Sequence, residues 1–161
     1  MTSLTDAGIS VSLPSGWDGQ IRAAGQGAPT AVQAAGTDEA AGGEGVVLHA
    51  ASFALPPDRG DYGSGAVEVM GGSDVLVCLL EHERAAADTA LFAREGIPRL
   101  VPSMFSPQSM QRAVPGMAGA QHFFRVGGRP FCLYVVVGTW RTRAPLVRAA
   151  DGVVSSIRIS G

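Results

Sequence analysis

Three histidines are the residues of this sequence best suited to catalysis or metal binding. His49, His82 and His122 each lie in a segment whose apolar pattern predicts a β-strand. His82 stands between Glu81 and Glu83, and a carboxylate beside an imidazole is a combination that serves general acid–base chemistry. One interpretation is therefore a hydrolase that uses Glu81, His82 and His122.

The competing interpretation of the same residues is structural. Polar side chains often mark the point where a buried strand emerges into water, and a histidine among apolar residues is usually a hydrogen-bonded core group. The sequence has no Cys-x-x-Cys or His-x-x-x-His spacing of the kind that marks zinc sites. We therefore expect no metal and no other cofactor. Cys78 and Cys132 lie in apolar runs, which predicts buried free thiols, with a cross-strand disulfide as the alternative.

The sequence lacks the usual signatures of a serine nucleophile and of a phosphate-binding loop. The closest match to Gly-x-Ser-x-Gly is Tyr62-Gly63-Ser64-Gly65, which has no glycine two residues before the serine. Gly60, Gly63 and Gly65 precede a predicted short helix, but no lysine follows them. We interpret these glycines as a turn, and the Arg59-Gly60-Asp61 tripeptide as a chance occurrence.

Composition narrows the possible functions. The chain has 161 residues, enough for one domain with a full core. Its net charge is −2, and all 12 basic residues are arginines scattered from Arg22 to Arg158, so no nucleic-acid-binding face is expected. The first residues are polar, and the longest apolar run, PFCLYVVVG, is shorter than a membrane span. We therefore expect a cytoplasmic protein with no membrane insertion.

Strand patterns recur along the chain. Ile9, Val11 and Leu13 alternate with serines, which predicts a half-buried strand, and Gln20–Arg22 predicts a short returning strand. The pattern also predicts a strand over 46–57, ending at two prolines, and a central strand over 74–83 that is covered on both faces. The segments 120–126 and 129–138 flank Gly127-Gly128, which predicts a hairpin.

Helices are predicted over 65–70, over 84–95, after Ser106 as the N-cap, and from Pro145 to the end of the chain. The apolar positions of the last helix are Leu146, Ala149, Ala150, Val153 and Ile157. Residues 25–45 are small or polar and predict a flexible Gly/Ala-rich loop. The order of the predicted strands and helices indicates a single α+β domain over 1–161. We expect an antiparallel sheet flanked by helices, with the C-terminal helix on one face.

Two stretches, GISVSLPSGW (8–17) and DGVVSSIRI (151–159), resemble the ends of the PsbP-like superfamily. That superfamily includes the photosystem extrinsic protein, a Ran-binding import factor and bacterial secretion chaperones. The resemblance implies the PsbP-like fold and a role in protein recognition. It carries no catalytic residue.

Met104, Phe105, Met110 and Met117 cluster in a segment rich in proline and serine. Methionines in irregular structure adapt to different partners, so we expect these four residues to bind an apolar segment of another protein. The alternative is that they fill gaps in the core. The expected function is a non-enzymatic adaptor or chaperone-like module, associated with secretion and forming a homodimer through an exposed sheet edge. A small-molecule or lipid carrier and the hydrolase above are the alternatives.

Overall fold

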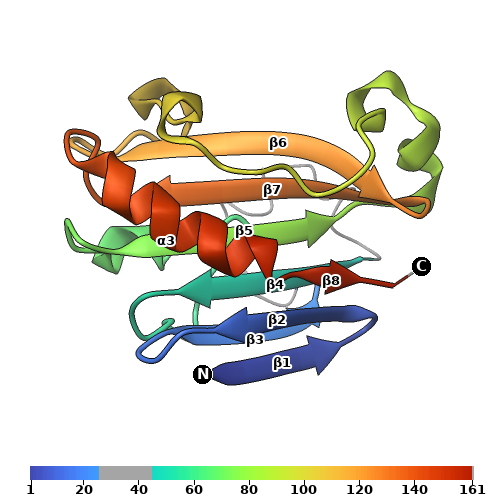
Figure 1. The fold of residues 1–161 in the computed structure, drawn as a ribbon, viewed down its shortest axis with the longest axis horizontal. Coiled ribbons are helices and arrows are strands. Elements are labelled where there is room, and N and C mark those ends of the chain that lie inside the picture. Colours follow the sequence, from blue (N-terminus) through green and yellow to red (C-terminus); the bar gives the residue numbers. More distant parts are fainter. Residues whose placement is uncertain (26–44, 161) are drawn as a thin grey trace.

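The protein has an α+β structure in which two antiparallel sheets and one α-helix pack together (Figure 1). The structure is a computed structural model and describes residues 1–25 and 45–160. The α+β class expected from the sequence is confirmed, whereas the finer PsbP-like assignment stays a prediction. The predicted flexible loop at 25–45 lies almost entirely outside the described residues.

The larger sheet has five strands in the order β3-β4-β5-β7-β6, and each neighbouring pair is antiparallel. The strands are β3 (Asp18–Ala23), β4 (Val46–Ala51), β5 (Val75–Glu81), β6 (Ala118–Val126) and β7 (Arg129–Val137). All residues of β5 and β7 are buried. The apolar run of β5 is unbroken because a central strand is covered on both faces. The predicted central strand is confirmed.

The sequence predicted the β6–β7 turn correctly but placed the end of β4 too late. Gly127 and Gly128 form the two-residue turn between β6 and β7 with φ of 57° and 87°, so the predicted hairpin is confirmed. β4, predicted to continue to residue 57, ends at Ala51. Beyond it, the Ser52 hydroxyl accepts a hydrogen bond from the Val75 backbone N–H (2.9 Å) and donates to the Asp74 carboxylate (3.0 Å). The Ser52 backbone N–H still donates to the Val75 oxygen (3.1 Å), and the side-chain bonds fix the chain where the ladder ends.

The smaller sheet joins the two ends of the chain. It has the order β1-β2-β8, with β1 (Thr2–Asp6), β2 (Ile9–Leu13) and β8 (Arg158–Ile159). The predicted alternation of β2 is confirmed, since Ile9, Val11 and Leu13 are buried. β1 was not predicted: four of its five residues are exposed and only Leu4 is half-buried, so it has no apolar pattern.

Helix α3 (Arg143–Ser155) crosses the larger sheet and contacts β2, β5 and β7 (Figure 1). The expected packing of a C-terminal helix on a sheet face is confirmed. The buried stripe is displaced from the prediction: Val147, Ala150, Val153 and Val154 are buried in the helix, whereas Ala149 is exposed. The helix begins two residues before Pro145 and ends before Ile157, because the chain turns there into β8.

The other predicted helices are short 3-10 turns. They are η1 (Val67–Val69), η2 (Arg84–Asp88), η3 (Ala90–Phe92) and η5 (Pro107–Ser109). A further 3-10 turn, η4 (Pro102–Met104), was not predicted. The continuous helices predicted over 65–70 and 84–95 are therefore wrong. Between 84 and 95 only Ala87 and Phe92 are buried, which leaves too little apolar contact to stabilise a long helix. The predicted Ser106 cap is confirmed, since its hydroxyl accepts from the Gln108 N–H (3.1 Å).

The larger sheet separates two cores. The helix-side core lies between the sheet, α3 and β2, and includes Val77, Leu133, Phe131 and Val153. The far-side core lies on the opposite face and includes Leu76, Cys78, Tyr134 and Met117. Within the described residues, no helix is long and apolar enough to span a membrane.

Candidate functional site

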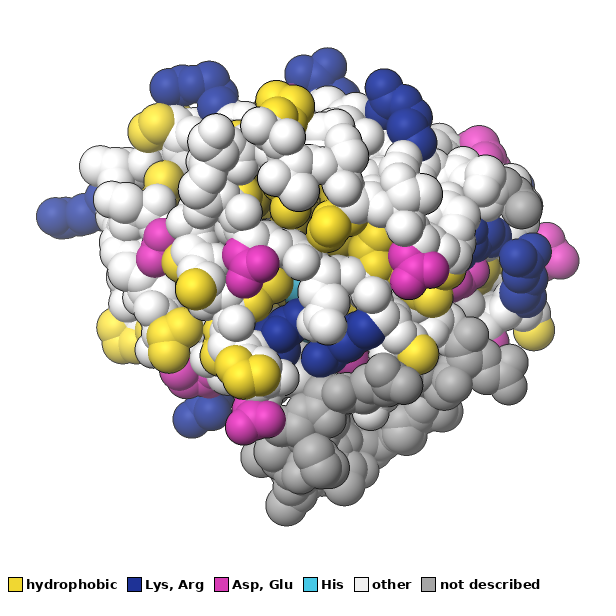
Figure 2. All heavy atoms as spheres, turned by 90° about the horizontal axis from the view of Figure 1, so that it is seen from below, with side chains coloured by type: hydrophobic (Ala, Val, Ile, Leu, Met, Phe, Trp, Pro, Cys, Tyr) yellow, Lys and Arg dark blue, Asp and Glu magenta, His cyan; other side chains and the backbone are white. Residues whose placement is uncertain are grey.

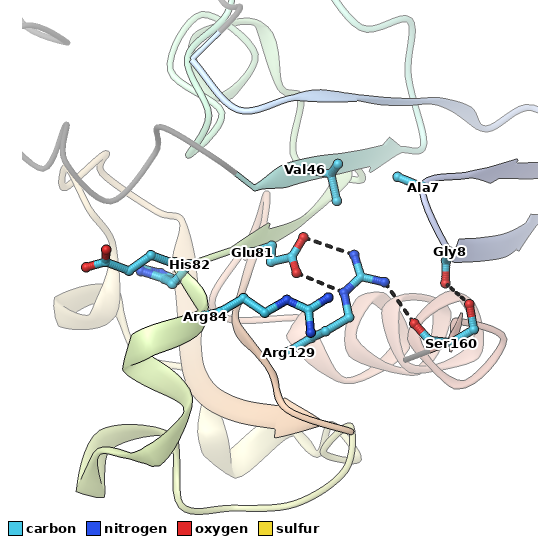
Figure 3. Close-up of a pocket in the computed structure, with 9 residues that line it drawn as sticks. Ala7, Gly8, Val46, Glu81, His82, Arg84, Arg129 and Ser160 are labelled. Carbon is cyan, nitrogen blue, oxygen red and sulfur yellow. Dashed lines mark hydrogen bonds and ion pairs between the residues drawn. The ribbon is translucent and has the colours of Figure 1, made fainter.

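A cavity of about 420 Å³ lies at one end of the seam between the two sheets (Figure 3). One side is formed by the β1–β2 turn at Ala7 and Gly8 and by Ser160 after β8. The other side is formed by the starts of β4 and β7, by the end of β5 and the two residues after it, and by the first residue of η2. We call this space the seam cavity. Its volume is in the range of sites that bind small molecules.

A buried ion pair between Glu81 and Arg129 forms the inner wall of the seam cavity. Glu81 is the last residue of β5, and Arg129 is the first residue of β7 after the glycine turn. Glu81 pairs with Phe131 in the ladder, so Glu81 and Arg129 lie on the same face of adjacent strands. Arg129 Nε and Nη2 donate to the two Glu81 carboxylate oxygens at 2.8 and 2.9 Å. These hydrogen bonds raise the pKa of Arg129.

Arg129 also ties the smaller sheet to the larger one. Its Nη1 donates to the backbone oxygen of Ser160 (2.9 Å), and the Ser160 N–H donates to the Gly8 oxygen (2.8 Å). Gly8 has φ of 79°, and a Cβ there would come within 2.8 Å of Arg129 Nη1. A glycine is thus required both by the turn and by the closeness of the guanidinium. The ion pair is in the first place a clamp between the sheets.

Arg84 is the lining arginine that has no polar partner among the described residues. It follows Glu83 at the start of η2, and its exposed side chain extends toward the Glu81–Arg129 pair (Figure 3). Within the described part of the chain, the Arg84 guanidinium makes no hydrogen bond and no ion pair. A guanidinium in this situation has its full donor capacity available for a ligand.

The structure does not bring Glu81, His82 and His122 together. The Glu81 carboxylate is occupied by Arg129 on the helix-side face. The His82 ring lies on the far-side face against Phe92, at 5.2 Å between ring centroids. His122 is opposite Leu133 in the ladder and therefore lies on the helix-side face. Burial lowers the pKa of both histidines. The hydrolase interpretation thus lacks the convergence that it requires.

His49 belongs to a second polar cluster, which the sequence did not reveal. Its Nδ1 accepts from Arg59 Nε (2.8 Å), so its Nε2–H donates to the Asp61 backbone oxygen (2.8 Å). Arg59 also donates to the Pro56 oxygen (2.7 Å) and to the Gln20 side chain. Burial lowers the pKa of His49 to about 3. We call this set the His49 lock; its Arg59 and Asp61 belong to the tripeptide that we interpreted as a chance occurrence.

Cys78 and Cys132 are buried free thiols, as predicted. Burial raises the pKa of Cys132 to about 11 and raises that of Cys78 further. Neither thiol is therefore ionised near neutral pH. Among residues 1–25 and 45–160, no three His, Cys, Asp or Glu side chains are grouped to hold a metal ion.

The four residues predicted to bind a partner do not line a common surface. Phe105 and Met117 are buried, whereas Met104 and Met110 are half-buried. Met104 and Phe105 pack in the helix-side core, and Met110 and Met117 pack in the far-side core. The first two and the last two of these side chains therefore pack on opposite faces of the sheet. Filling the core, the alternative considered above, accounts for this arrangement.

A second hollow of about 400 Å³ lies beside the C-terminal end of α3. Its apolar lining comes from Ile97, Val126, Val154 and Ile157. Arg99 at its rim is paired with Asp151 (3.0 Å).

Comparison with protein-family models, with curated proteins and with solved structures finds no match to this chain. The resemblance to the PsbP-like superfamily therefore remains a prediction, and the function has to be argued from the site itself.

Proposed function

We propose that the protein is a non-enzymatic binding module, an adaptor whose seam cavity receives a carboxylate of its ligand. The observation that carries this proposal is the Arg84 guanidinium, which lines the seam cavity and is uncommitted within the described residues. Guanidinium groups bind carboxylates through two parallel hydrogen bonds, which supplies both geometry and charge.

Several ionisable groups that could serve catalysis are instead held in structural contacts or kept neutral, which supports binding rather than catalysis; His82 of the lining differs, because its Nε2 has no hydrogen-bond partner within the described residues. Arg129 holds Glu81, Arg59 holds His49, and burial keeps both thiols protonated near neutral pH. A general base or nucleophile needs a free, suitably poised group at the reacting atom. The Glu81 carboxylate, the His49 ring and the two thiols instead have structural roles.

The electrostatics of the lining favour one carboxylate at a time. The charge of Arg129 is offset by Glu81, so Arg84 is the positive group to which a ligand carboxylate can bind. Glu83 also lines the cavity and repels an anion. Replacing Glu83 by glutamine is therefore expected to tighten carboxylate binding several-fold.

The carboxylate has two sources to be distinguished: a free small molecule or an acidic side chain of a partner protein. The test is a titration of ¹⁵N-labelled protein followed by NMR, with succinate in one arm and an acidic peptide in the other. Binding moves the Arg84 Nε–Hε signal and the Gly8 amide. A peptide that binds much more tightly than succinate supports the adaptor role, and the reverse supports a small-molecule carrier.

The control variants are Arg84→Gln and Arg148→Gln. Arg148 is an exposed arginine of α3 that does not line the seam cavity, so its replacement should leave the titration unchanged. The proposal is supported if the ligand-induced shift of the Gly8 amide is lost in Arg84→Gln and kept in Arg148→Gln. The proposal fails if neither succinate nor the peptide moves these signals at millimolar concentration.

The apolar hollow beside α3 favours a second candidate, carriage of an apolar small molecule. Its lining of Ile97, Val126, Val154 and Ile157 suits an alkyl group. Native mass spectrometry of the purified protein would detect such a ligand. The Val126 side chain is partly exposed, so Val126→Asp is a suitable variant. Loss of the ligand adduct in this variant would place the ligand in the hollow beside α3.

A further inference from the structure

Strand β1 is an open edge of the smaller sheet. It pairs with β2 along its whole length, from Thr2 opposite Leu13 to Asp6 opposite Ile9. Within the described residues, no segment pairs with its outer side. The β6 edge of the larger sheet differs, because Gly119 and Arg125 there bond to Ser106, Arg94 and Gly96. β1 also lacks the lysine, proline or bulge that protects many edge strands.

The pairing of β1 with β2 fixes which backbone groups face outward. Ser12 of β2 donates its N–H to the Ser156 hydroxyl (3.0 Å) and accepts from that hydroxyl (3.2 Å), on the side away from β1. Ser3 lies directly opposite Ser12. In antiparallel pairs whose groups do not bond to each other, both residues direct their N–H and C=O away from the partner. Ser3 and Thr5, two residues apart, therefore present theirs on the open edge.

We propose that β1 pairs with β1 of a second copy of this chain, antiparallel and centred on Leu4. In this register Ser3 lies opposite Thr5 of the other copy, and Thr5 lies opposite its Ser3. Both are the outward-facing residues, so about four backbone hydrogen bonds form across the two-fold axis. Leu4, whose own groups bond to β2, forms the central pair. The two smaller sheets become one continuous sheet of twice the width.

The charges of β1 permit this register. Asp6 is its only charged side chain, and it lies opposite Thr2 of the second copy. The two Asp6 carboxylates are then roughly 13 Å apart, which is more than the screening length in physiological salt. Figure 2 views the molecule from the side on which β1 lies in Figure 1. Outside the part drawn in grey, acidic, basic and hydrophobic side chains are interspersed there, so no cluster of one charge opposes the approach.

Proline at position 5 tests the pairing without breaking β1–β2. The Thr5 N–H faces outward, and proline is tolerated on an edge strand at such a position. We expect Thr5→Pro to abolish dimers in sedimentation velocity over a concentration series. Thr5→Val keeps the N–H and the β-branched side chain, and should dimerise like the wild type. Native amide signals of β5 and β7 would verify that both variants fold.

Hydrogen exchange locates the interface. In the wild type, the Ser3 and Thr5 amides should become protected as concentration rises. The proposal is overturned if the protein stays monomeric at every concentration, if Thr5→Pro dimerises as well as the wild type, or if the protection of Ser3 and Thr5 does not depend on concentration. Constant protection of both amides would show that another part of the same chain, or a different bound strand, occupies the edge, whereas constant lack of protection would show that the edge is unpaired. None of these outcomes bears on the seam cavity.

Discussion

The Glu81–Arg129 clamp and the His49 lock are two buried polar clusters with different consequences. Both hold an arginine by several hydrogen bonds, and both fix an irregular segment to the larger sheet. The clamp borders the seam cavity, where Arg84 has no polar partner within the described part of the chain. The residues of the lock line neither of the two cavities described above. A buried arginine is thus a structural group in both places, and the ligand-binding interpretation rests on its uncommitted neighbour.

The largest expected effect comes from breaking the clamp. Arg129→Met leaves the Glu81 carboxylate buried without a partner and frees Ser160, so the free energy of unfolding should fall by about 3–5 kcal/mol. Urea unfolding measures this change. Adding Glu81→Leu to Arg129→Met should recover most of the loss, because the unpaired charge is removed. A double variant as unstable as the single one would show that the clamp stabilises by some other means.

The His49 lock should make stability depend on pH. The unfolded histidine has a pKa near 6.5, and the folded one has a pKa of about 3. Between these values the unfolded chain binds the extra proton, so stability falls as the pH is lowered from 6.5 toward 3, by at most about 1.4 kcal/mol per pH unit. His49→Asn, which keeps an acceptor for Arg59, should reduce this slope. Urea unfolding at several pH values compares the two proteins, and equal slopes would contradict the lock.

The smallest effect on stability is expected at Arg84. Its side chain is exposed and makes no bond within the described residues, so Arg84→Ala should change the free energy of unfolding by less than about 0.5 kcal/mol. Urea unfolding measures the free energy of unfolding of this variant and of Arg129→Met. A small loss for Arg84→Ala and a large loss for Arg129→Met would distinguish a ligand-binding arginine from a structural one. A loss of several kcal/mol would mean that Arg84 supports the fold. Arg84 and Arg129 would then both be structural arginines, and the distinction between them would be wrong.

The sequence predicted those elements whose burial creates a pattern. β2, β5 and the β6–β7 hairpin have alternation, an apolar run or a glycine pair, and all were located. β1 has no pattern because water covers most of its side chains, and it is held by backbone bonds to β2. The alanines of 84–95 favour a helix by propensity, but tertiary contacts there support only 3-10 turns.

The candidate site was only partly predictable. Glu81 and His82 attracted attention because polar residues end an apolar strand, and both line the seam cavity. Arg129, the partner of Glu81, is 48 residues from it along the chain, and only the register of β5 against β7 brings the two together. The packing of the methionine cluster was not predictable for a related reason: spacing along an irregular segment does not say which core each side chain enters.

The contact between Ser12 and Ser156 also constrains when the protein can finish folding. The two residues are 144 positions apart, so the first hairpin has no β8 beside it until Arg158 and Ile159 have left the ribosome. Contacts between such distant residues form late and slowly, because a long loop must close first. During synthesis the apolar side of β2 stays in water, where chaperones have the time to bind it.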